Sequence, residues 1–443
     1  MAISIDPETG LKRFNTRASK ATEKISGKGY SLVDEELLKT LPEQFPGAVF
    51  GAQEQAKYKA FKEARRGAGD YVSLEGEFSD YIRDVYSGTP VDRDSLDDEC
   101  EILVVGAGFA GLLLWYKLRA AGFRDVRFCE RGGDVGGTWY WNRYPGARCD
   151  VESMQYSYSF SEELEQEWEW SEKYSPQPEI LKYANHVADK FNLHDNIYLS
   201  TRVERAVFDE NKNRWFIHTD RGDRVSSQFC VMAVGCLSAA NIPQFEKLEG
   251  FNGDIYHTGE WPHGGVDFTG KNVGVIGTGS SAIQSIPIIA QQAKSLKVFQ
   301  RTPNYAVPGW NSKMDPGYEK EVKANYPELR AKARSRPAGV YFPFNFQPAV
   351  EASESERLSK YEEFWKRGGL PFLGAFGDLL FNAESNETAA EFARKKIREI
   401  VKDPITADLL CPQNTFGCKR CLLYTSDAAD ERSSVDLGGR RII

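Results

Sequence analysis

The chain has few of the residues that mark small secreted or metal-binding proteins. Its 443 residues include only eight cysteines and five histidines. The cysteines form no recognisable disulfide framework, and no two histidines stand at metal-ligand spacing, so we predict no metal site. A protein of this kind is typical of a reducing compartment, and we expect a cytoplasmic location.

Long apolar runs and an excess of positive charge are also missing. No apolar run reaches the length that crosses a bilayer, and the opening residues, MAISIDPETG, do not resemble a secretory signal. The formal net charge of −8 at pH 7 disfavours nonspecific nucleic-acid binding. We therefore expect neither a membrane nor a nucleic acid as partner, and a chain of this length suits two or three domains. The oligomeric state is not predicted.

Two glycine-rich loops stand out against this background. GAGFAG (106–111) follows the apolar run EILVV (101–105) and precedes a helical pattern. GTGSSA (277–282) follows KNVGVI (271–276) and precedes a second helical pattern from Ser280. A buried strand, a glycine turn and a helix in this order form the dinucleotide-binding fingerprint. The sequence therefore predicts an α/β fold with two Rossmann-like units.

The glycines have distinct expected roles in the first loop. Gly106 permits the tight turn, Gly108 lets the backbone approach a pyrophosphate, and Gly111 allows close contact between helix and strand. The third position of the second loop is Ala282, which the fingerprint tolerates. FCVMAVG (229–235) predicts a second buried strand of the first unit, near the expected flavin edge.

One charged residue in each unit separates the two ligands. Glu130 lies 24 residues after Gly106, and Arg301 lies 24 residues after Gly277. A carboxylate accepts hydrogen bonds from ribose hydroxyls and repels a 2′-phosphate, whereas a guanidinium suits a 2′-phosphate. We therefore expect FAD at the first loop and NADPH at the second.

A twelve-residue signature lies between the two loops. FNGDIYHTGEWP (251–262) fits the pattern FxGxxxHTxxWP at every specified position. With this segment, the chain resembles the single-component Baeyer–Villiger monooxygenases. GDVGGTWYWNRYPGARCDVES (133–153), FQRTPNYAVP (299–308) and FGCKR (416–420) are similarly close to the family pattern, and the resemblance extends over about 99–420.

The resemblance implies a domain organisation. Two Rossmann-like domains, for FAD and NADP, would carry a helical insertion, and the FAD domain would be incomplete at its C-terminus. The expected segments are a polar, mainly helical N-terminal extension (1–98), the first part of the FAD domain (99–238), a linker with the signature (239–262), and an NADP domain (263–420) with a helical subdomain at about 315–403.

The resemblance also implies site residues. The catalytic set is Arg148, Asp150, His257 and Arg420, in which His257 would couple domains rather than transfer a proton. The flavin-contacting set is Gly106, Gly108, Ala110, Gly111, Glu130, Gly137, Thr138, Trp139, Tyr140, Asp150, Tyr156 and Val203. The NADP-contacting set is Gly277, Thr278, Gly279, Ser280, Ser281, Gln284, Arg301, Thr302 and Lys419.

The implied reaction inserts one oxygen atom of O2 beside the carbonyl of a small ketone, through a flavin peroxide, to give an ester or a lactone. Arg420, held by Asp150, would stabilise the anions that form. Three alternatives stay open: an N- or S-oxidising flavin monooxygenase, a disulfide reductase, and an inactive, C-terminally truncated fragment. A disulfide reductase would need a redox pair that Cys129 and Cys149 do not match in spacing.

The last 23 residues, 421–443, have a different character. CLLYTSDAADE and VDLGGRRII match the translation of a transposase-type sequencing adapter. We expect this tail to be non-native and to take no part in the fold, so that CxxC at Cys418 and Cys421 is an accident of the junction. The natural reading frame is then expected to leave this sequence just after Arg420.

Overall fold

The computed structural model contains a six-stranded, a three-stranded and a two-stranded sheet, together with a group of helices. The described residues are 84–88, 93–235, 237, 240, 242, 245, 248–335 and 339–417, with the strands β1 (Ile3–Ile5), β2 (Lys12–Phe14) and β11 (Arg440–Ile442). β1 pairs with β2 in antiparallel fashion. Most of the predicted N-terminal extension and tail lies outside the described residues.

The first unit is built on a six-stranded sheet. Its strands, in spatial order, are β5 (Ile197–Tyr198), β4 (Val126–Cys129), β3 (Asp97–Val105), β8 (Arg224–Met232), β7 (Arg214–Thr219) and β6 (Val203–Asp209). The first four are parallel, whereas β7 pairs antiparallel with both β8 and β6. Parallel strands need crossover connections, and here helices supply them. The helical elements of this unit are α4 (Phe109–Ala120), α5 (Thr138–Trp141), α6 (Glu162–Glu167), α7 (Gln177–Lys190) and η2 (His194–Asn196).

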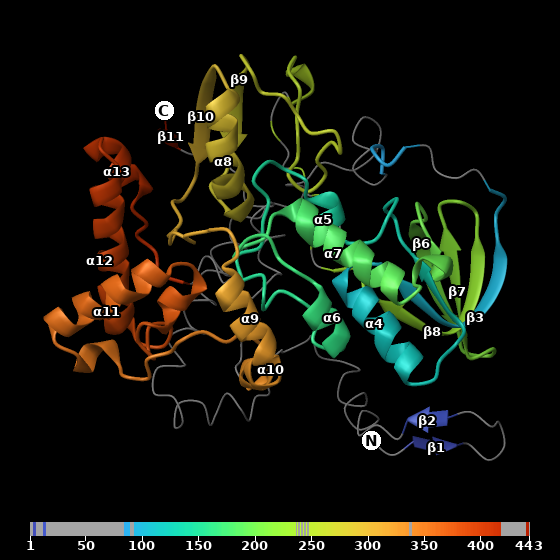
Figure 1. Cartoon of the computed structure of the whole chain (residues 1–443). Helices are drawn as coiled ribbons and strands as arrows, with labels where there is room; N and C mark the ends of the chain where they lie inside the picture. The colour runs from blue at the N-terminus through green and yellow to red at the C-terminus, as the bar shows by residue number, and fades with distance from the viewer. Residues whose placement is uncertain are drawn as a thin grey trace.

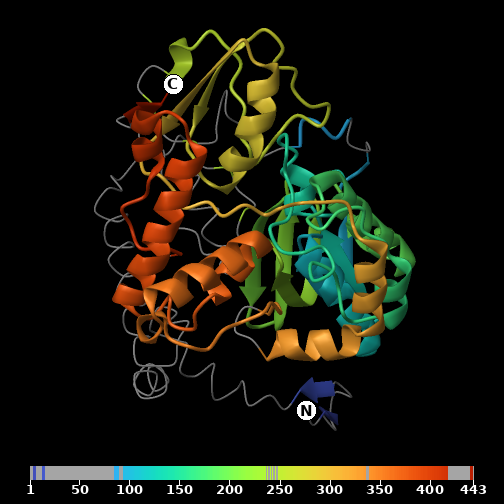
Figure 2. The same cartoon turned by 60° about the vertical axis from the view of Figure 1, so that its left-hand side comes forward.

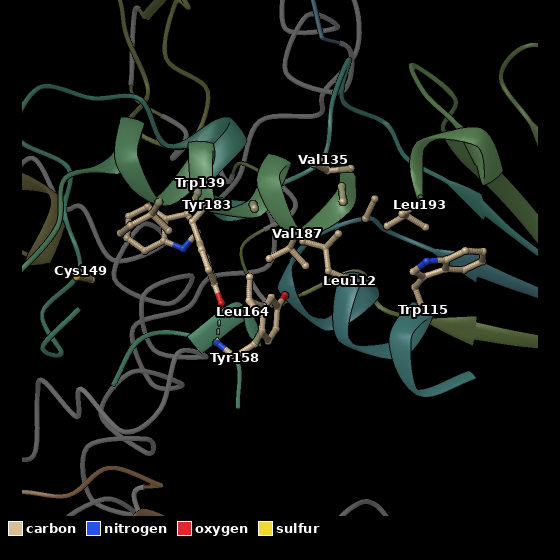
Figure 3. Packing of buried hydrophobic residues seen from close by; sticks show 14 of the residues in the cluster. Leu112, Trp115, Val135, Trp139, Cys149, Tyr158, Leu164, Tyr183, Val187 and Leu193 are labelled. Carbon is tan, nitrogen blue, oxygen red and sulfur yellow. Dashed lines mark hydrogen bonds between the residues drawn. The ribbon is translucent and has the colours of Figure 1, made fainter. Parts of the chain in front are cut away.

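The core of this unit explains why these segments fold as they do. Ile102, Leu103 and Val104 of β3 are buried because β3 has β4 on one side and β8 on the other. In α7, Ile180, Tyr183, Ala184 and Val187 follow helical spacing and are all buried. Figure 3 shows Val187 facing Leu112 of α4 in the same cluster. The strand and helix predicted around the first loop are confirmed.

The C-terminal half of β8 differs from the prediction of a buried strand. Phe229 and Met232 are 48% and 55% exposed. The strand starts earlier than predicted, at Arg224, and its register with β7 covers only Arg224 to Ser227. Beyond Ser227, β3 is its single neighbour in the sheet as described, so one edge of an apolar strand is left open.

The second unit contains a smaller sheet. β9 (Asn272–Ile276) and β10 (Ser295–Gln300) are parallel and are joined by α8 (Ser280–Gln292), and β11 pairs antiparallel with β10. Trp261, Phe268 and Ile289 form its buried core. This confirms the second strand–loop–helix prediction, and Figure 1 shows the unit apart from the six-stranded sheet.

Helices dominate the chain after β10, as predicted. They are α9 (Pro316–Ala324), α10 (Tyr326–Arg334), α11 (Glu354–Arg367), α12 (Ala383–Ile400) and α13 (Pro404–Leu410), with short 3-10 turns at η4 (Ala349–Glu351) and η5 (Leu370–Gly374). A further 3-10 turn, η3 (Leu248–Gly250), lies between β8 and β9. α9 and α10 place Val322 and Tyr326 in the core of the first unit. α11 and α12 form a separate cluster around Tyr361, Phe372 and Phe392. Figure 2 shows this division.

Candidate functional site

The first glycine loop joins β3 to α4. Gly106 has a φ of +105°, and a Cβ atom there would lie 2.5 Å from the carbonyl oxygen of Ala233. A Cβ atom at Gly111 would lie 2.3 Å from the carbonyl oxygen of Gly106. Both positions therefore require glycine. α4 begins after Gly108 without a side-chain cap, which leaves its first amides available to an anion.

Glu130 lies at the end of β4, beside this loop. Its Oε2 accepts a hydrogen bond from the Ala107 amide at 2.7 Å, and its Oε1 accepts one from the Gly132 amide at 2.7 Å. The residue is only 6% exposed, and burial raises the pKa of Glu130, although the two amides act in the opposite direction. The carboxylate is thus fixed between two glycine-containing segments of the first unit.

The second of these segments, 132–137, packs directly on the first loop. The Gly136 amide donates to the Ala107 carbonyl at 3.1 Å. A Cβ atom at Gly137, whose φ is +54°, would lie 2.8 Å from the Cα atom of Gly108. The two backbones are therefore in contact with no room for a side chain between them.

An aromatic group follows this segment in α5. Trp139 and Tyr140 are buried, whereas Thr138 is exposed. Trp139 donates from Nε1 to the Tyr156 hydroxyl at 3.0 Å, and burial raises the pKa of Tyr156 to about 12. Figure 3 shows Trp139 beside Tyr183 of α7 in the core of the unit. Val203 starts β6 and is partly buried.

The second glycine loop has the same backbone form as the first. Gly277 has a φ of +101°, and its amide donates to the carbonyl of Phe299 at 2.8 Å. That bond brings the end of β10, and Arg301 just after it, next to the loop. α8 begins after Gly279 without a side-chain cap. The remaining predicted residues of this loop are partly buried: Thr278, Ser280, Ser281 and Thr302.

Gln284 of α8 connects the two units. Its Oε1 accepts from the Tyr144 hydroxyl at 2.9 Å, and its Nε2 donates to the Arg148 carbonyl at 3.1 Å. A Cβ atom at Gly146 would lie 2.3 Å from the Gln284 carbonyl oxygen. The backbones of the first and second units therefore touch at this point.

Arg148 and Asp150 lie on this same connecting segment. Arg148 donates to Glu172 at 2.9 Å and to the carbonyl of Tyr174 at 3.2 Å. Asp150 is exposed and lines a pocket of about 760 Å³. The opposite walls of the pocket come from α9, α10 and the stretch 339–343, and they include Tyr318, Tyr326, Arg330, Tyr341 and Phe342.

The signature segment crosses from one unit to the other. Trp261 is buried in the core of the second unit. The preceding residue, Glu260, forms a salt bridge of 3.0 Å with Arg131 of the first unit, and the Arg131 guanidinium lies 4.0 Å from the Trp141 ring centre. His257 accepts a hydrogen bond from the Gly259 amide on Nδ1 at 3.1 Å, which shapes the turn of the signature. Sequence reasoning missed Arg131 because no motif marks it.

Two predicted site residues, Lys419 and Arg420, lie outside the described residues. The last described residues before them are Phe416 and Gly417. The Phe416 ring lies 4.9 Å from that of Tyr305, which follows Arg301 by four positions. Of the remaining predicted residues, Ala110 is exposed at the start of α4.

Three further features of the described residues concern metal ligands, membrane-spanning helices and cysteines. Among the described residues, no cluster of His, Cys, Asp and Glu could hold a metal ion. No helix in the same part of the chain is long and apolar enough to span a bilayer. Cys129 and Cys149 are free and buried, and burial raises the pKa of both thiols to about 12, which makes them poor redox nucleophiles.

Comparison with known proteins identifies the family. The model of the pyridine nucleotide-disulphide oxidoreductases matches residues 103–335. The chain belongs to this family. Among the described residues, Cys129 and Cys149 are buried and unpaired with raised thiol pKa values, so these two do not form the redox pair of a disulfide reductase.

The individual proteins that the chain resembles include several monooxygenases. The chain is 42% identical over 319 residues to a Baeyer–Villiger monooxygenase of Pseudooceanicola batsensis, covering 72% of this chain and 58% of that protein. It is 40% identical over 319 residues to a phenazine N-monooxygenase of Lysobacter antibioticus, covering 72% and 59%. A solved structure of an oxidised steroid monooxygenase bound to NADP has 53% identity and a TM-score of 0.70, covering 74% of this chain and 64% of that one.

These findings confirm the predicted resemblance to the Baeyer–Villiger monooxygenases and the predicted fold class. The chain spans about three fifths of the length of the curated relatives it matches.

Proposed function

We propose that the chain is part of an NADPH-dependent flavin monooxygenase that inserts one oxygen atom of O2 beside a ketone carbonyl, giving an ester or a lactone. The observation that carries this proposal is the signature segment. It lies between two nucleotide-type loops and contacts both units, through Trp261 in the second core and Glu260 on Arg131. A segment that joins a flavin site to a nicotinamide site suits an enzyme that must bring both cofactors together.

The first unit has features that fit FAD. The close backbone contacts at Gly106 and Gly111 hold the turn in place, and the uncapped start of α4 leaves its first amides available to a pyrophosphate. The fixed carboxylate of Glu130 can accept hydrogen bonds from ribose hydroxyls. The neighbouring residues Gly137, Thr138, Trp139, Tyr140, Tyr156 and Val203 complete the flavin set that we propose.

The second unit has features that fit NADPH. The uncapped start of α8 after Gly279 suits the pyrophosphate, and Arg301 follows the strand beside that loop. A guanidinium there favours a 2′-phosphate over a hydroxyl. We assign Lys419 to the same phosphate contact. Phe416, three positions before Lys419, packs on Tyr305, which is four positions after Arg301 in the sequence.

The flavin, when bound, supplies the oxygen-transfer chemistry, and the protein supplies charge and exclusion of water. Arg420 would stabilise an oxyanion at the ketone carbonyl through a charge-assisted hydrogen bond. Asp150 would hold the Arg420 guanidinium, and Asp150 faces a pocket large enough for a small organic substrate. Arg148, fixed by Glu172, would place the segment that carries Asp150, and His257 would couple the units.

We propose a small ketone and O2 as the reacting partners, and a cytoplasmic location in keeping with the free cysteines. The test combines flavin absorbance, NADPH oxidation and product analysis by gas chromatography. It compares the 443-residue chain with a longer form that carries the residues encoded after Arg420 in the genomic reading frame. Esters or lactones from linear, cyclic and aryl ketones are expected from the longer form.

Other results have distinct meanings. Because one relative is named a phenazine N-monooxygenase, the assay includes aromatic amines, and N-oxides without esters would contradict the ketone assignment. Esters from the longer form alone would favour the inactive-fragment alternative for the shorter one. Arg420→Ala should keep flavin reduction by NADPH but lower ester formation roughly a hundredfold or more, since it removes the oxyanion partner. A normal ester yield from this variant would rule out that role.

A further inference from the structure

Asp84 is a buried carboxylate that no sequence motif marks. Its side chain is 2% exposed, whereas the next two residues, Val85 and Tyr86, are 47% and 42% exposed. A short stretch that exposes its apolar residues and buries its acid is the reverse of the usual pattern. Burying a carboxylate is costly unless it is paired and hydrogen-bonded, so its partners indicate what it holds.

The partners of Asp84 come from two distant parts of the chain. Oδ2 accepts from the Tyr140 hydroxyl at 2.5 Å and from the Gly133 amide at 3.0 Å. Oδ1 lies 3.8 Å from Nε2 of His263, directly after the signature. The ring of His263 lies edge-on to that of Tyr140, with their centres 5.1 Å apart. The carboxylate of Asp84 thus connects the 84–88 segment, the first unit and the residue that follows the signature.

The hydrogen bond from the Gly133 amide is the most informative of the contacts that Asp84 makes. The two consecutive amides of Gly132 and Gly133 are divided between two carboxylates: Gly132 donates to Glu130 and Gly133 donates to Asp84. A Cβ atom at Gly133 would lie 2.5 Å from Cβ of Ser87, so the 84–88 segment packs directly on this backbone. Glu130 in turn accepts from Ala107 in the first glycine loop. Asp84 is therefore linked to that loop through hydrogen bonds on both sides of the Gly132–Gly133 backbone.

We propose that Asp84 is a positioning residue for the first nucleotide site. It holds one end of the 132–137 segment, whose other end rests on the first glycine loop through Gly136 and Gly137. Without it, the Tyr140 hydroxyl loses its acceptor, and the Gly133 amide keeps only that hydroxyl, at 3.1 Å. The bond from Gly132 to Glu130 is then left to hold this end of the segment near the loop. This inference rests on the proposed function, because FAD is the ligand expected at this site.

The test measures the dissociation constant of FAD by flavin fluorescence, together with thermal unfolding of the FAD-free protein. Asp84→Ala should weaken FAD binding by about tenfold or more, because the Tyr140 hydroxyl loses its acceptor and the Gly133 amide loses its charged partner. Asp84→Asn, which keeps an acceptor oxygen, should recover affinity to within about threefold of the unsubstituted protein. The matched control is Asp94→Ala, which removes an exposed carboxylate ten residues further along and should change neither quantity.

Each outcome has a defined meaning. Equal FAD affinities in Asp84→Ala and Asp94→Ala would overturn the inference, as would a loss of stability in the FAD-free protein with FAD affinity unchanged. If Asp84→Ala does not fold, Tyr140→Phe decides: it removes one hydroxyl and should weaken FAD about threefold or more, and an unchanged affinity would overturn the inference. Failure of the unsubstituted protein to bind FAD would overturn the proposed function as well, whereas the other results leave that function standing.

Discussion

The two glycine loops have the same backbone form but very different surroundings. Gly106 and Gly277 have φ values of +105° and +101°. A Cβ atom at Gly106 would be 2.5 Å from the carbonyl oxygen of Ala233, just after β8, whereas one at Gly277 would meet nothing within 4 Å among the described residues. The fingerprint therefore sets the turn in both units, and the surrounding sheet decides how tightly the turn is held.

Glu130 and Arg301, the charged residues beside the two loops, also differ in how firmly their surroundings hold them. Glu130 is 6% exposed and bonded to two backbone amides. Arg301 is only partly buried at the end of β10, beside the second loop. Backbone hydrogen bonds thus fix the charged group of the first unit, and the second unit presents its charge on a long side chain. A tightly held cofactor suits the first arrangement, and a cofactor that exchanges suits the second.

The largest expected difference between the units comes from their first glycines. Gly106→Ala should lower the free energy of unfolding by about 3 kcal/mol, because positive φ strain adds to a clash with the Ala233 carbonyl. Gly277→Ala carries the strain alone, and about 1–2 kcal/mol is expected. Urea unfolding of the two FAD-free variants measures both. Equal losses of unfolding free energy in the two variants would show that the surroundings of the loops do not affect the cost of the substitution.

The next largest effect concerns the positive charge of Arg301 beside the second loop. Arg301→Ala should raise the KM for NADPH by roughly tenfold to a hundredfold and leave NADH use unchanged, since a charge-assisted hydrogen bond contributes about 1.5–3 kcal/mol. Steady-state kinetics with both nucleotides provide the measurement. The assignment of the second loop to NADPH fails if the unsubstituted enzyme uses the two nucleotides equally well.

A third prediction compares buried and exposed ion pairs. Asp223 of the first unit is fully buried and bonded to Arg93 at 2.6 Å, which holds its pKa at about 2. Its folded pKa is below its unfolded value, so its stabilisation is present above about pH 4 and is lost as the pH falls towards 2. Asp223→Asn should cost roughly 2 kcal/mol at pH 7, and the difference should narrow between pH 5 and pH 3.

The control for that pair lies in the second unit. Asp254 and Lys271 are 66% and 50% exposed, so Asp254→Asn should change stability by less than about 0.5 kcal/mol at any pH in this range. A pH-independent loss in Asp223→Asn would mean that its effect comes from packing rather than from ionisation.

The smallest effect concerns the contact between the units. Tyr144→Phe removes the hydrogen bond to Gln284 and should lower stability by about 1 kcal/mol. If the units unfold separately, the loss should appear in both transitions of a calorimetric scan. A loss confined to one transition would show that this bond does not couple them.

The sequence was most informative where structure is local. The strands and helices on both sides of the two loops occur where the apolar runs predict them, and Glu130 lies at the end of its strand beside the first loop. These features depend on short-range periodicity and on glycine, which a single sequence records. The exposure of β8 was missed because it depends on which strand pairs beyond Ser227.

Asp84 and Arg131 were missed for a related reason. Asp84 meets the Gly133 amide across 49 residues, and Arg131 meets Glu260 across 129. Nothing in the residues around either position marks the partner, since a carboxylate or a guanidinium in a polar stretch is usually solvated. Contacts of this kind emerge only once the tertiary structure is known.

The contact between Gly146 and Gln284 has a mechanical consequence. Because the two backbones touch with no side chain between them, α8 cannot slide towards the first unit, and the hydrogen bonds from Gln284 resist its withdrawal. Rotation about this point is the movement that costs least. If the second unit swings against the first, this contact would be its pivot, and the displacement would be smallest near Arg148 and would grow with distance along β9 and β10.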